Sequence, residues 1–275
     1  MGAGGKMGQR LTDNLKTTDH DVRHVEVSEA GKAALRERGI ETVSAEQALD
    51  GAEVVILAIP DNLIGTVTSE LDPHFQAGQV LMCLDPAAPY AGKLPERDDL
   101  TYFVTHPCHP NIFKDADDAD PAALRDFFGG IAGKQAIVCA LMQGPEAHYA
   151  LGEEIACTIF QPVSRSHRIT VEQMAILEPP LSETVGATLV SALREATDEA
   201  VRRGVPAAAA RDFMLGHLTI ELAILFEELE GAQFSDGALK AIEQAKPHIL
   251  QPDWLKVFEP ENIRKSIQDI TNPQA

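Results

Sequence analysis

The residues with the clearest chemical potential are two histidines three positions apart, His106 and His109, in Thr-His-Pro-Cys-His-Pro at residues 105–110. Imidazole titrates near neutral pH, so each can act as a general base, a substrate ligand or a metal ligand. The stretch directly follows a short apolar run, which predicts a position at a strand end. The alternative is a surface histidine pair in a turn, because loop histidines without a function are common.

A cationic island follows at Ser164-Arg165-Ser166-His167-Arg168. It stands out in a chain whose formal net charge is −19. Arg165, His167 and Arg168 offer what a carboxylate or hydroxy-acid substrate needs for binding. The alternative is a helix-entry loop whose arginines pair with surface carboxylates.

Glu178 lies inside an otherwise apolar helical pattern, immediately before Pro179-Pro180. A carboxylate in such a place is costly unless it is exposed, paired or bound to a metal. We therefore expect Glu178 to be an acid/base partner of the histidines, or to hold a divalent cation together with His106 or His109. The alternative is a kinked helix in which Glu178 meets solvent or caps the backbone.

The N-terminal residues Gly2, Gly5 and Gly8 follow the spacing G-x-x-G-x-x-G and open directly into a helical pattern. Glycine allows a tight turn and a close backbone approach to a pyrophosphate, and a helix N-terminus favours anions. The stretch predicts a dinucleotide site. A flexible glycine-rich terminus is the alternative, since the spacing departs from G-x-G-x-x-G.

Glu26 stands 18 residues after Gly8, near the end of a valine-rich run at 21–27 that predicts a strand. An acidic residue at this distance binds the ribose hydroxyls of NAD and repels the extra phosphate of NADP, so NAD is the expected cofactor. The apolar run 53–59 predicts a buried strand, and its C-terminal end should line the cofactor path. The residues expected there are Ala58, Pro60, Asp61 and Asn62.

Strand-like runs at 21–27, 53–59, 79–84, 100–104 and 134–142 alternate with helical patterns. This alternation predicts an α/β fold, a Rossmann-type doubly wound parallel sheet over residues 1–142. The glycine turn of such a domain follows a buried strand, yet only Met1 precedes Gly2. We expect residues upstream of Met1 to supply that strand, because deleting a central parallel strand exposes apolar surface on its neighbours.

In residues 143–275, helical patterns replace the strand-like runs. This change predicts an all-helical second domain for substrate binding and dimerisation. Helical patterns cover 145–160, 170–203, 206–229, 236–246 and 260–270, with a kink or break expected at Pro179-Pro180. Apolar patches at 207–214 and 218–226 predict a homodimer interface.

The acidic composition limits the kinds of partner that the protein can bind. An acidic surface repels phosphate backbones and anionic membranes, so we expect neither nucleic acid nor a membrane, but a small hydroxy-acid molecule. No apolar run approaches the ~18 residues of a membrane span. The four cysteines lack metal-type spacing, and Cys83 and Cys139 lie in apolar runs as buried thiols. A reducing cytoplasm fits this usage.

Four segments together resemble the D-apionate oxidoisomerases, within a wider group that carries a phosphogluconate-dehydrogenase-like C-terminal domain. They are Gly-Ala-Gly-Gly-Lys-Met-Gly at 2–8, Thr-His-Pro-Cys-His-Pro at 105–110, Ala-Leu-Met-Gln-Gly-Pro-Glu at 140–146 and His-Arg-Ile-Thr-Val-Glu-Gln-Met-Ala-Ile-Leu-Glu-Pro at 167–179. The resemblance spans nearly the whole chain. It departs at Pro179-Pro180, where relatives are expected to have Pro-Gly.

The resemblance implies an NAD-linked enzyme of sugar-acid breakdown, which oxidises the 2-hydroxyl of a branched hydroxy acid. A substituent then migrates from the neighbouring tertiary alcohol carbon and gives 3-oxo-isoapionate. The implied roles are pyrophosphate binding by Gly4, Gly5, Lys6 and Met7 beside Gly2, ribose binding by Glu26, proton removal by His106 or His109, carboxylate binding by Arg165 or Arg168, and a possible metal site at His106 and Glu178.

Two other functions remain open. A simple or decarboxylating β-hydroxy-acid dehydrogenase usually relies on a catalytic lysine in the helical domain, and no lysine lies between Lys134 and Lys240, which counts against it. A non-catalytic NAD-sensing protein would bind the cofactor without turnover, and would tolerate changes at His106, His109 and Glu178.

Overall fold

The computed structural model describes residues 1–114 and 120–272. The chain forms two compact units, one made of Met1–Glu178 with the residues from Arg264 onward, and the other of Pro179–Ile263. The boundary expected at residue 142 differs from this division, because residues 147–159, 163–168 and 171–176 belong to the sheet or pack against it.

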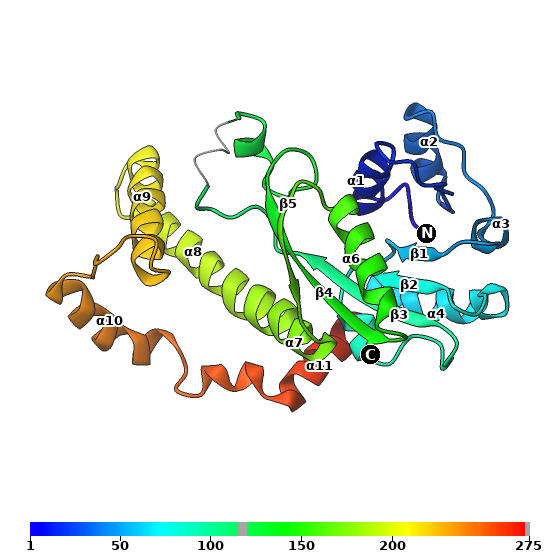
Figure 1. Ribbon diagram of the computed structural model, residues 1–275. Coiled ribbons are helices and arrows are strands. Elements are labelled where there is room, and N and C mark those ends of the chain that lie inside the picture. The colour runs from blue at the N-terminus through cyan, green and yellow to red at the C-terminus, as the bar shows by residue number, and fades with distance from the viewer. Residues whose placement is uncertain (115–119, 273–275) are drawn as a thin grey trace. The chain divides into compact units, whose positions relative to one another are not determined.

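One five-stranded sheet organises the first unit (Figure 1). Its strands, in spatial order, are β1 (Val54–Leu57), β2 (Val80–Cys83), β3 (Thr101–Pro107), β4 (Gln135–Gln143) and β5 (Val163–Arg168). Three neighbouring pairs are parallel, and only β3 and β4 run antiparallel. The expected α/β class is confirmed, as are the strands expected at 53–59, 79–84, 100–104 and 134–142.

One predicted strand is wrong, and one observed strand was not predicted. The run 21–27 forms no strand and contributes only an isolated parallel bridge between His24 and Thr42. A strand requires a ladder with its neighbours, and a cavity lies between this run and β1. Conversely, 163–168 is the edge strand β5, so residues 143–275 are not all-helical as expected. Among the strands that the structure describes, it pairs with β4 alone, and most of its polar side chains are exposed to solvent.

Helices cover both faces of the sheet. In chain order they are α1 (Lys6–Leu15), α2 (Glu29–Glu37), α3 (Ala45–Leu49), α4 (Asp61–Leu71), α5 (Ala87–Tyr90), α6 (Ala147–Ile159) and α7 (Val171–Ile176), with 3₁₀ turns at Asp72–His74 and Ala123–Arg125. On one face, α1 and α6 enclose a core around Phe103. On the other, α4, α5 and α7 enclose a core around Leu57 and Val104.

Close packing fixes α6 against the sheet. A Cβ atom at Gly152 of α6 would lie 2.4 Å from the ring of Phe103, which is fully buried in β3. Only glycine fits there, because a contact this short requires the ring or the helix to move. The helix is thereby held directly over β3, the strand that carries His106 near its end.

The second unit is helical. It contains α8 (Thr188–Arg202), α9 (Ala207–Leu225), α10 (Asp236–Ile249), a 3₁₀ turn at Trp254–Phe258 and the start of α11 (Pro260–Thr271). The expected interruption at Pro179-Pro180 takes the form of a π-helical segment, Leu177–Ala187. Proline lacks the N–H of an ordinary helical hydrogen bond, and a π-helical stretch accommodates that loss.

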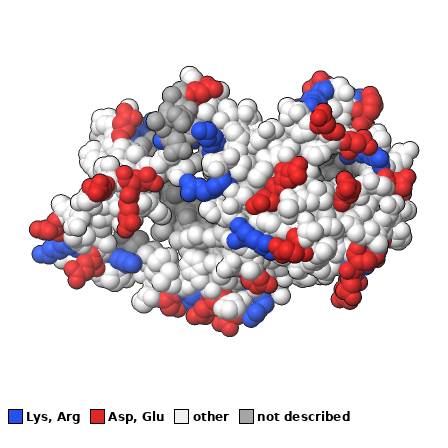
Figure 2. Space-filling model, viewed as in Figure 1, with Lys and Arg blue, Asp and Glu red and all other residues white. Residues whose placement is uncertain are grey.

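The outer surface is rich in acidic side chains. Acidic side chains occupy many parts of the face in view, as Figure 2 shows, in keeping with the net charge of −19. Among the described residues, none of the helices combines the length and the apolarity needed to cross a bilayer.

Candidate active site

His106 and Glu178 form the centre of a polar cluster in the first unit. Atom Nε2 of His106 lies 3.4 Å from Oε2 of Glu178, and both side chains are largely buried. On the other side of the ring, Nδ1 lies 2.9 Å from the carbonyl oxygen of Leu84. A carbonyl only accepts, so Nδ1 carries a hydrogen, and Nε2 is the ring nitrogen that faces Glu178.

Asp85 completes the cluster. It lies two residues after the end of β2, and its Oδ2 lies 3.7 Å from Nδ1 of His106. One ligand atom from each of Asp85, His106 and Glu178 lies within 4.8 Å of the other two, so the three side chains can hold a metal ion. Sequence reasoning assigned no role to Asp85. The available signal was its position, since the ends of β2 and β3 are neighbours on one sheet edge.

Burial and mutual repulsion perturb the carboxyl groups here. Burial, with the negative charge of Asp85 as a second cause, raises the pKa of Asp61 to about 7. Burial also raises the pKa of Glu178, against the opposing effect of His106. The Oδ1 atom of Asp61 is buried and has no hydrogen-bond partner among the described residues. Two carboxyl groups with raised pKa values around a histidine are typical of a functional site.

His109 lies beside His106 but at the surface, with 6.4 Å between the two ring centroids. Its backbone has a φ of 61°, which is rare for a residue with a side chain. Its Nδ1 lies 2.9 Å from the carbonyl oxygen of Phe128, so Nε2 is the ring nitrogen left to accept a proton. The structure thus brings His106, His109 and Glu178 together.

The sheet register places part of the cationic island on the same face. Val138 of β4 pairs with His106 on one side and with His167 on the other. Directly paired residues point to the same face, so His106 and His167 share a face. Arg165 pairs with Ala136, two residues from Val138, and belongs to that face as well. Its positive charge also acts on Cys108, next to His109.

Arg168 points to the opposite face. It pairs with Cys139, which is in turn paired with Thr105. Its guanidinium forms a bidentate ion pair with Glu146 and lies 4.1 Å from the ring centroid of Tyr149 on α6. Of the two arginines considered for the substrate carboxylate, the structure therefore brings Arg165, and not Arg168, to the histidine face.

The glycine turn is packed as the expected dinucleotide site requires. Gly2 has a φ of +73°, and a Cβ atom there would lie 2.3 Å from the carbonyl oxygen of Ala58. A Cβ atom at Gly4 would lie 2.4 Å from Gly31. Helix α1 begins at Lys6, and no side chain caps its N-terminus at Gly5. The N–H groups of its first turn, at Lys6 and Met7, therefore stay available to an anion.

Glu26 lies beside this turn. Its carboxylate accepts hydrogen bonds from the backbone N–H groups of Gly4 at 2.9 Å, Val27 at 2.9 Å and Ser28 at 2.8 Å. Partial burial raises the pKa of Glu26, but these hydrogen bonds outweigh it and hold the pKa below its usual range. The group is thus a carboxylate at neutral pH, placed next to the glycine turn.

The four residues expected along the cofactor path run from the end of β1 into the first turn of α4. Ala58 contacts the glycine turn, and Pro60 precedes the first residue of α4, Asp61. Asn62 follows and is exposed. Because Asp61 interacts with Asp85 and His106, this connection joins the glycine turn to the polar cluster.

Comparisons with known proteins identify the family. Residues 116–271 match the family described as phosphogluconate dehydrogenase (decarboxylating) C-term, and residues 2–86 match NADP oxidoreductase coenzyme F420-dependent. Proteins named D-apionate oxidoisomerase from Cupriavidus necator and Rhizobium rhizogenes are 57% and 58% identical over 272 residues. Each alignment covers 98% of both chains.

Solved structures agree. A semialdehyde dehydrogenase NAD-binding protein from Cupriavidus necator, crystallised with calcium and NAD, is 57% identical with a TM-score of 0.96, over 98% of this chain and 97% of that chain. An oxidoreductase from Jannaschia sp. CCS1 is 45% identical with a TM-score of 0.90, over 98% and 97%. The chain is an oxidoreductase and belongs to the D-apionate oxidoisomerase family.

Proposed function

We propose that this chain oxidises D-apionate with NAD and isomerises the product to 3-oxo-isoapionate, as a step of sugar-acid breakdown. The observation that carries the proposal is the cluster of Asp85, His106 and Glu178 at the sheet edge that also bears the glycine turn. Relatives 57–58% identical over nearly the full length have the name of this activity.

NAD fits the glycine turn. Gly5 has open space around it, since a Cβ atom there would meet only the Gly2 carbonyl oxygen at 3.4 Å. A pyrophosphate can approach this backbone and the uncapped N-terminus of α1, with Gly4, Lys6 and Met7 around it. The Glu26 carboxylate favours ribose hydroxyls and disfavours the 2′-phosphate of NADP. A relative of 57% identity was crystallised with NAD.

The proposed oxidation removes two electrons from the substrate carbon. The C–H hydride passes to the nicotinamide, the O–H proton passes to a histidine, and the alcohol becomes a ketone. A substituent on the adjacent tertiary alcohol carbon then shifts with its bonding pair to the new ketone carbon. The tertiary alcohol loses its proton and becomes the ketone, while the former ketone oxygen takes up a proton.

A divalent cation fits the cluster. Two carboxylates and one imidazole form a donor set that suits several divalent metals, and Nδ1–H of His106 is fixed by Leu84 in the way that orients metal-binding histidines. Such an ion would polarise the oxygens of an α-keto alcohol. Because Nε2 of His106 cannot hold both a cation and a proton, His109 is the proposed base when the cation is bound, and His106 is the base otherwise.

The substrate carboxylate is assigned to Arg165 with His167. Both belong to the sheet face of His106, and Arg165 is exposed and available to a ligand. A guanidinium binds a carboxylate through two parallel hydrogen bonds, which fixes orientation as well as charge. Arg168 is engaged with Glu146 on the other face and is not part of the proposed carboxylate site.

A homodimer is part of the proposal. Helix α9 is apolar around most of its circumference, yet only Ala210 and Ala223 of its 19 residues are buried. Phe213 and Leu225 remain 68% and 63% exposed. A helix with this pattern is normally buried, and a second copy of the chain is the proposed cover. Sedimentation should show a dimer, and Phe213→Glu should shift it toward monomer.

We propose the cytoplasm as the location. All four cysteines are free thiols, and burial raises the pKa of Cys139 to about 11, so this thiol stays protonated. Disulfides are rare in the reducing cytoplasm, so this state agrees with the expectation.

The test is NADH formation with D-apionate and related hydroxy acids, with and without EDTA. Turnover that EDTA abolishes and a divalent ion restores supports the metal-assisted oxidoisomerase. Turnover insensitive to EDTA removes the cation and leaves His106 as the base. NAD binding without turnover on any acid would overturn the proposal in favour of a sensor.

A further inference from the structure

The connection between β3 and β4 contains a loop, residues 126–133, that folds around one buried carboxylate. Oδ1 of Asp126 accepts a hydrogen bond from the N–H of Gly129 at 3.0 Å. Its Oδ2 accepts three more, at 3.0–3.1 Å, from the N–H groups of residues 131–133. Burial raises the pKa of Asp126, but these hydrogen bonds outweigh it and hold the pKa below its usual range. Asp126 is therefore ionised at neutral pH, and residues 126–133 are called the Asp126 loop below.

One of these hydrogen bonds leads directly to His109. The N–H of Gly129 and the carbonyl of Phe128 belong to the same peptide group. That carbonyl oxygen lies 2.9 Å from Nδ1 of His109, while the N–H donates to Asp126. A trans peptide group is planar, and its N–H and C=O point in opposite directions, so fixing one end fixes the other. The carboxylate and the imidazole are thus bound to the two ends of one rigid unit.

His109 needs such support. Its side chain is exposed, and its φ of 61° lies in the left-handed region, which is costly for a residue with a side chain. A neutral histidine free in water prefers its hydrogen on Nε2, the nitrogen that has to accept the substrate proton. The hydrogen bond from Nδ1 to the carbonyl of Phe128 reverses this preference and leaves the lone pair on Nε2.

The Asp126 loop is also bound to α1 through a second peptide group. The carbonyl of Gly130 accepts a hydrogen bond from Nδ2 of Asn14 at 3.1 Å, and the N–H of this peptide group, that of Ile131, donates to Oδ2 of Asp126. The two oxygens of one carboxylate therefore hold two peptide groups, one bound to His109 and the other to α1. Because α1 begins at the glycine turn, the loop fixes His109 relative to the proposed dinucleotide site.

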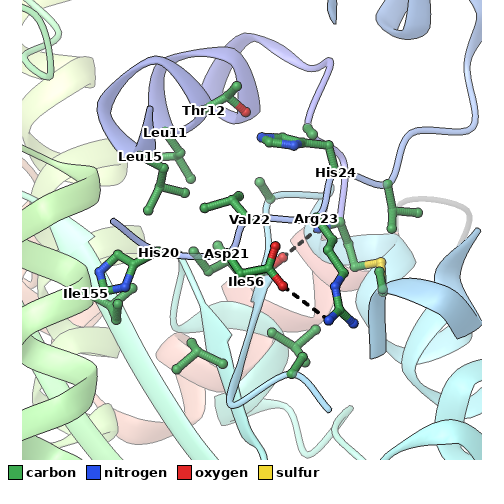
Figure 3. A pocket seen from close by; sticks show the side chains of 18 of the residues that line it. Leu11, Thr12, Leu15, His20, Asp21, Val22, Arg23, His24, Ile56 and Ile155 are labelled. Atoms are coloured by element: carbon green, nitrogen blue, oxygen red, sulfur yellow. Dashed lines mark hydrogen bonds and ion pairs between the residues drawn. The ribbon is translucent and has the colours of Figure 1, made fainter. Parts of the chain in front are cut away.

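Arg10 strengthens the contact between α1 and the loop. Its Nη1 donates to the carbonyl oxygen of Gly129 at 3.3 Å, and its Cζ lies 4.8 Å from the ring centroid of Phe128. Arg10 and Asn14 are four positions apart and therefore share one side of the helix. A neighbouring side lines the cavity next to Val22 with Leu11, Thr12 and Leu15 (Figure 3). The loop thus has a side of α1 to itself.

We propose that Asp126 is a positioning residue for His109. Through the peptide group between Phe128 and Gly129, it keeps the ring hydrogen on Nδ1 and leaves Nε2 free to accept the substrate proton. The role of His109 as a base rests on the proposed function, whereas the orientation of its ring can be measured without turnover. Asp126 acts only through the backbone, so its effect should appear in the ring and in the rate of the chemical step.

The test is the tautomer of His109 in the full chain, measured from the ¹⁵N NMR signals of the ring at a fixed alkaline pH in EDTA. The chain with His109→Gln identifies these signals. Asp126→Asn keeps the shape of the side chain but replaces one oxygen by a donor, which cannot accept an N–H. The matched control is Asp120→Asn, since Asp120 is an exposed residue of the same connection and accepts one backbone N–H, that of Ala122 at 2.9 Å.

The Nδ1–H tautomer should predominate in the parent chain and in Asp120→Asn. In Asp126→Asn, the ratio of Nδ1–H to Nε2–H should fall roughly 2- to 10-fold, the range expected for one weakened hydrogen bond. The same variant should lower kcat roughly 10- to 100-fold and change KM for the hydroxy acid little, because a misplaced base slows the chemical step without removing the groups that bind substrate.

Three results would overturn the proposal. The first is an Nε2–H ring in the parent chain, and the second is a tautomer ratio or a kcat in Asp126→Asn equal to that of the control. The third is loss of the fold in Asp126→Asn, seen by circular dichroism, which would make Asp126 a structural residue. A parent chain that turned over no acid would contradict the proposed function, and the tautomer would still decide whether Asp126 holds the ring.

Discussion

Atom Nε2 of His106 faces Oε2 of Glu178 across 3.4 Å, while Nδ1 of the same ring is bound to the carbonyl oxygen of Leu84. One strand end and one helical segment, 72 positions apart in the sequence, thus present a ring nitrogen and a carboxylate to one point. Because Leu84 fixes the orientation of the ring, His106 and Glu178 are suited to bind a cation or to transfer a proton. Substitutions at these residues should therefore affect activity.

Replacing Glu178 by glutamine should lower kcat by roughly 100-fold or more while leaving the fold intact. Glutamine keeps the shape of the side chain but can neither exchange a proton nor bind a cation as a carboxylate does. Steady-state kinetics and circular dichroism measure the two effects. The matched control is Glu172→Gln, which changes an exposed carboxylate on α7. Equal kinetics for the two variants would contradict the role of Glu178.

The two arginines of β5 should behave differently. Arg165→Gln removes the proposed partner of the substrate carboxylate, and a hydrogen-bonded charge pair of ~1.5–3 kcal/mol corresponds to a roughly 10- to 100-fold higher KM for the hydroxy acid. Arg168→Gln breaks the surface pair with Glu146 and should change KM little. A larger rise in KM for Arg168→Gln than for Arg165→Gln would show that the substrate carboxylate binds on the sheet face of Arg168 instead.

The cofactor preference should depend on Glu26. Glu26→Gln removes the negative charge that disfavours the 2′-phosphate, so the ratio of KM for NADP to KM for NAD should fall. Because Glu26 also accepts the N–H of Gly4, a small loss of thermal stability is expected. Glu29→Gln, an exposed neighbour, is the control. An unchanged ratio in Glu26→Gln would leave Glu26 with a structural role only.

Asp61 should make stability depend on pH. Its pKa is about 7 in the folded chain and near 3.8 when unfolded, so the folded state binds the extra proton between these values. The contribution of Asp61 to the free energy of unfolding should therefore be greatest below about pH 4 and fall as pH rises toward 7. The variant Asp61→Asn has no titrating group at this position, so its free energy of unfolding should not fall with pH for this reason.

Melting temperatures of Asp61→Asn and the parent chain, measured in EDTA from pH 5 to 8, test this effect. The variant should gain on the parent as pH rises, whereas the exposed Asp98→Asn serves as the surface control. A constant difference between Asp61→Asn and the parent across this range would show that Asp61 does not take up the proton.

Much of the fold followed from local patterns, but the site did not follow completely. The strands β1 to β4 could be predicted from their apolar runs, because strands buried on both faces of a sheet contain few polar residues. β5 is polar on both faces as an edge strand, so its sequence resembles a loop. Asp85 was missed for another reason: its importance comes from the adjacency of β2 and β3, which single-strand patterns do not contain. The segment 21–27 has the composition of a strand but forms an isolated bridge between His24 and Thr42, and a bridge depends on a partner that local composition does not reveal.

The most direct test of the central claim is the structure of the product from D-apionate labelled with ¹³C at the carbon that bears the oxidised hydroxyl. Oxidation with rearrangement predicts that the label ends as a tertiary alcohol carbon beside an unlabelled ketone in the NMR spectrum. A label that remains at the ketone carbon, with NADH formed in equal amount, would contradict the account and identify a simple dehydrogenase.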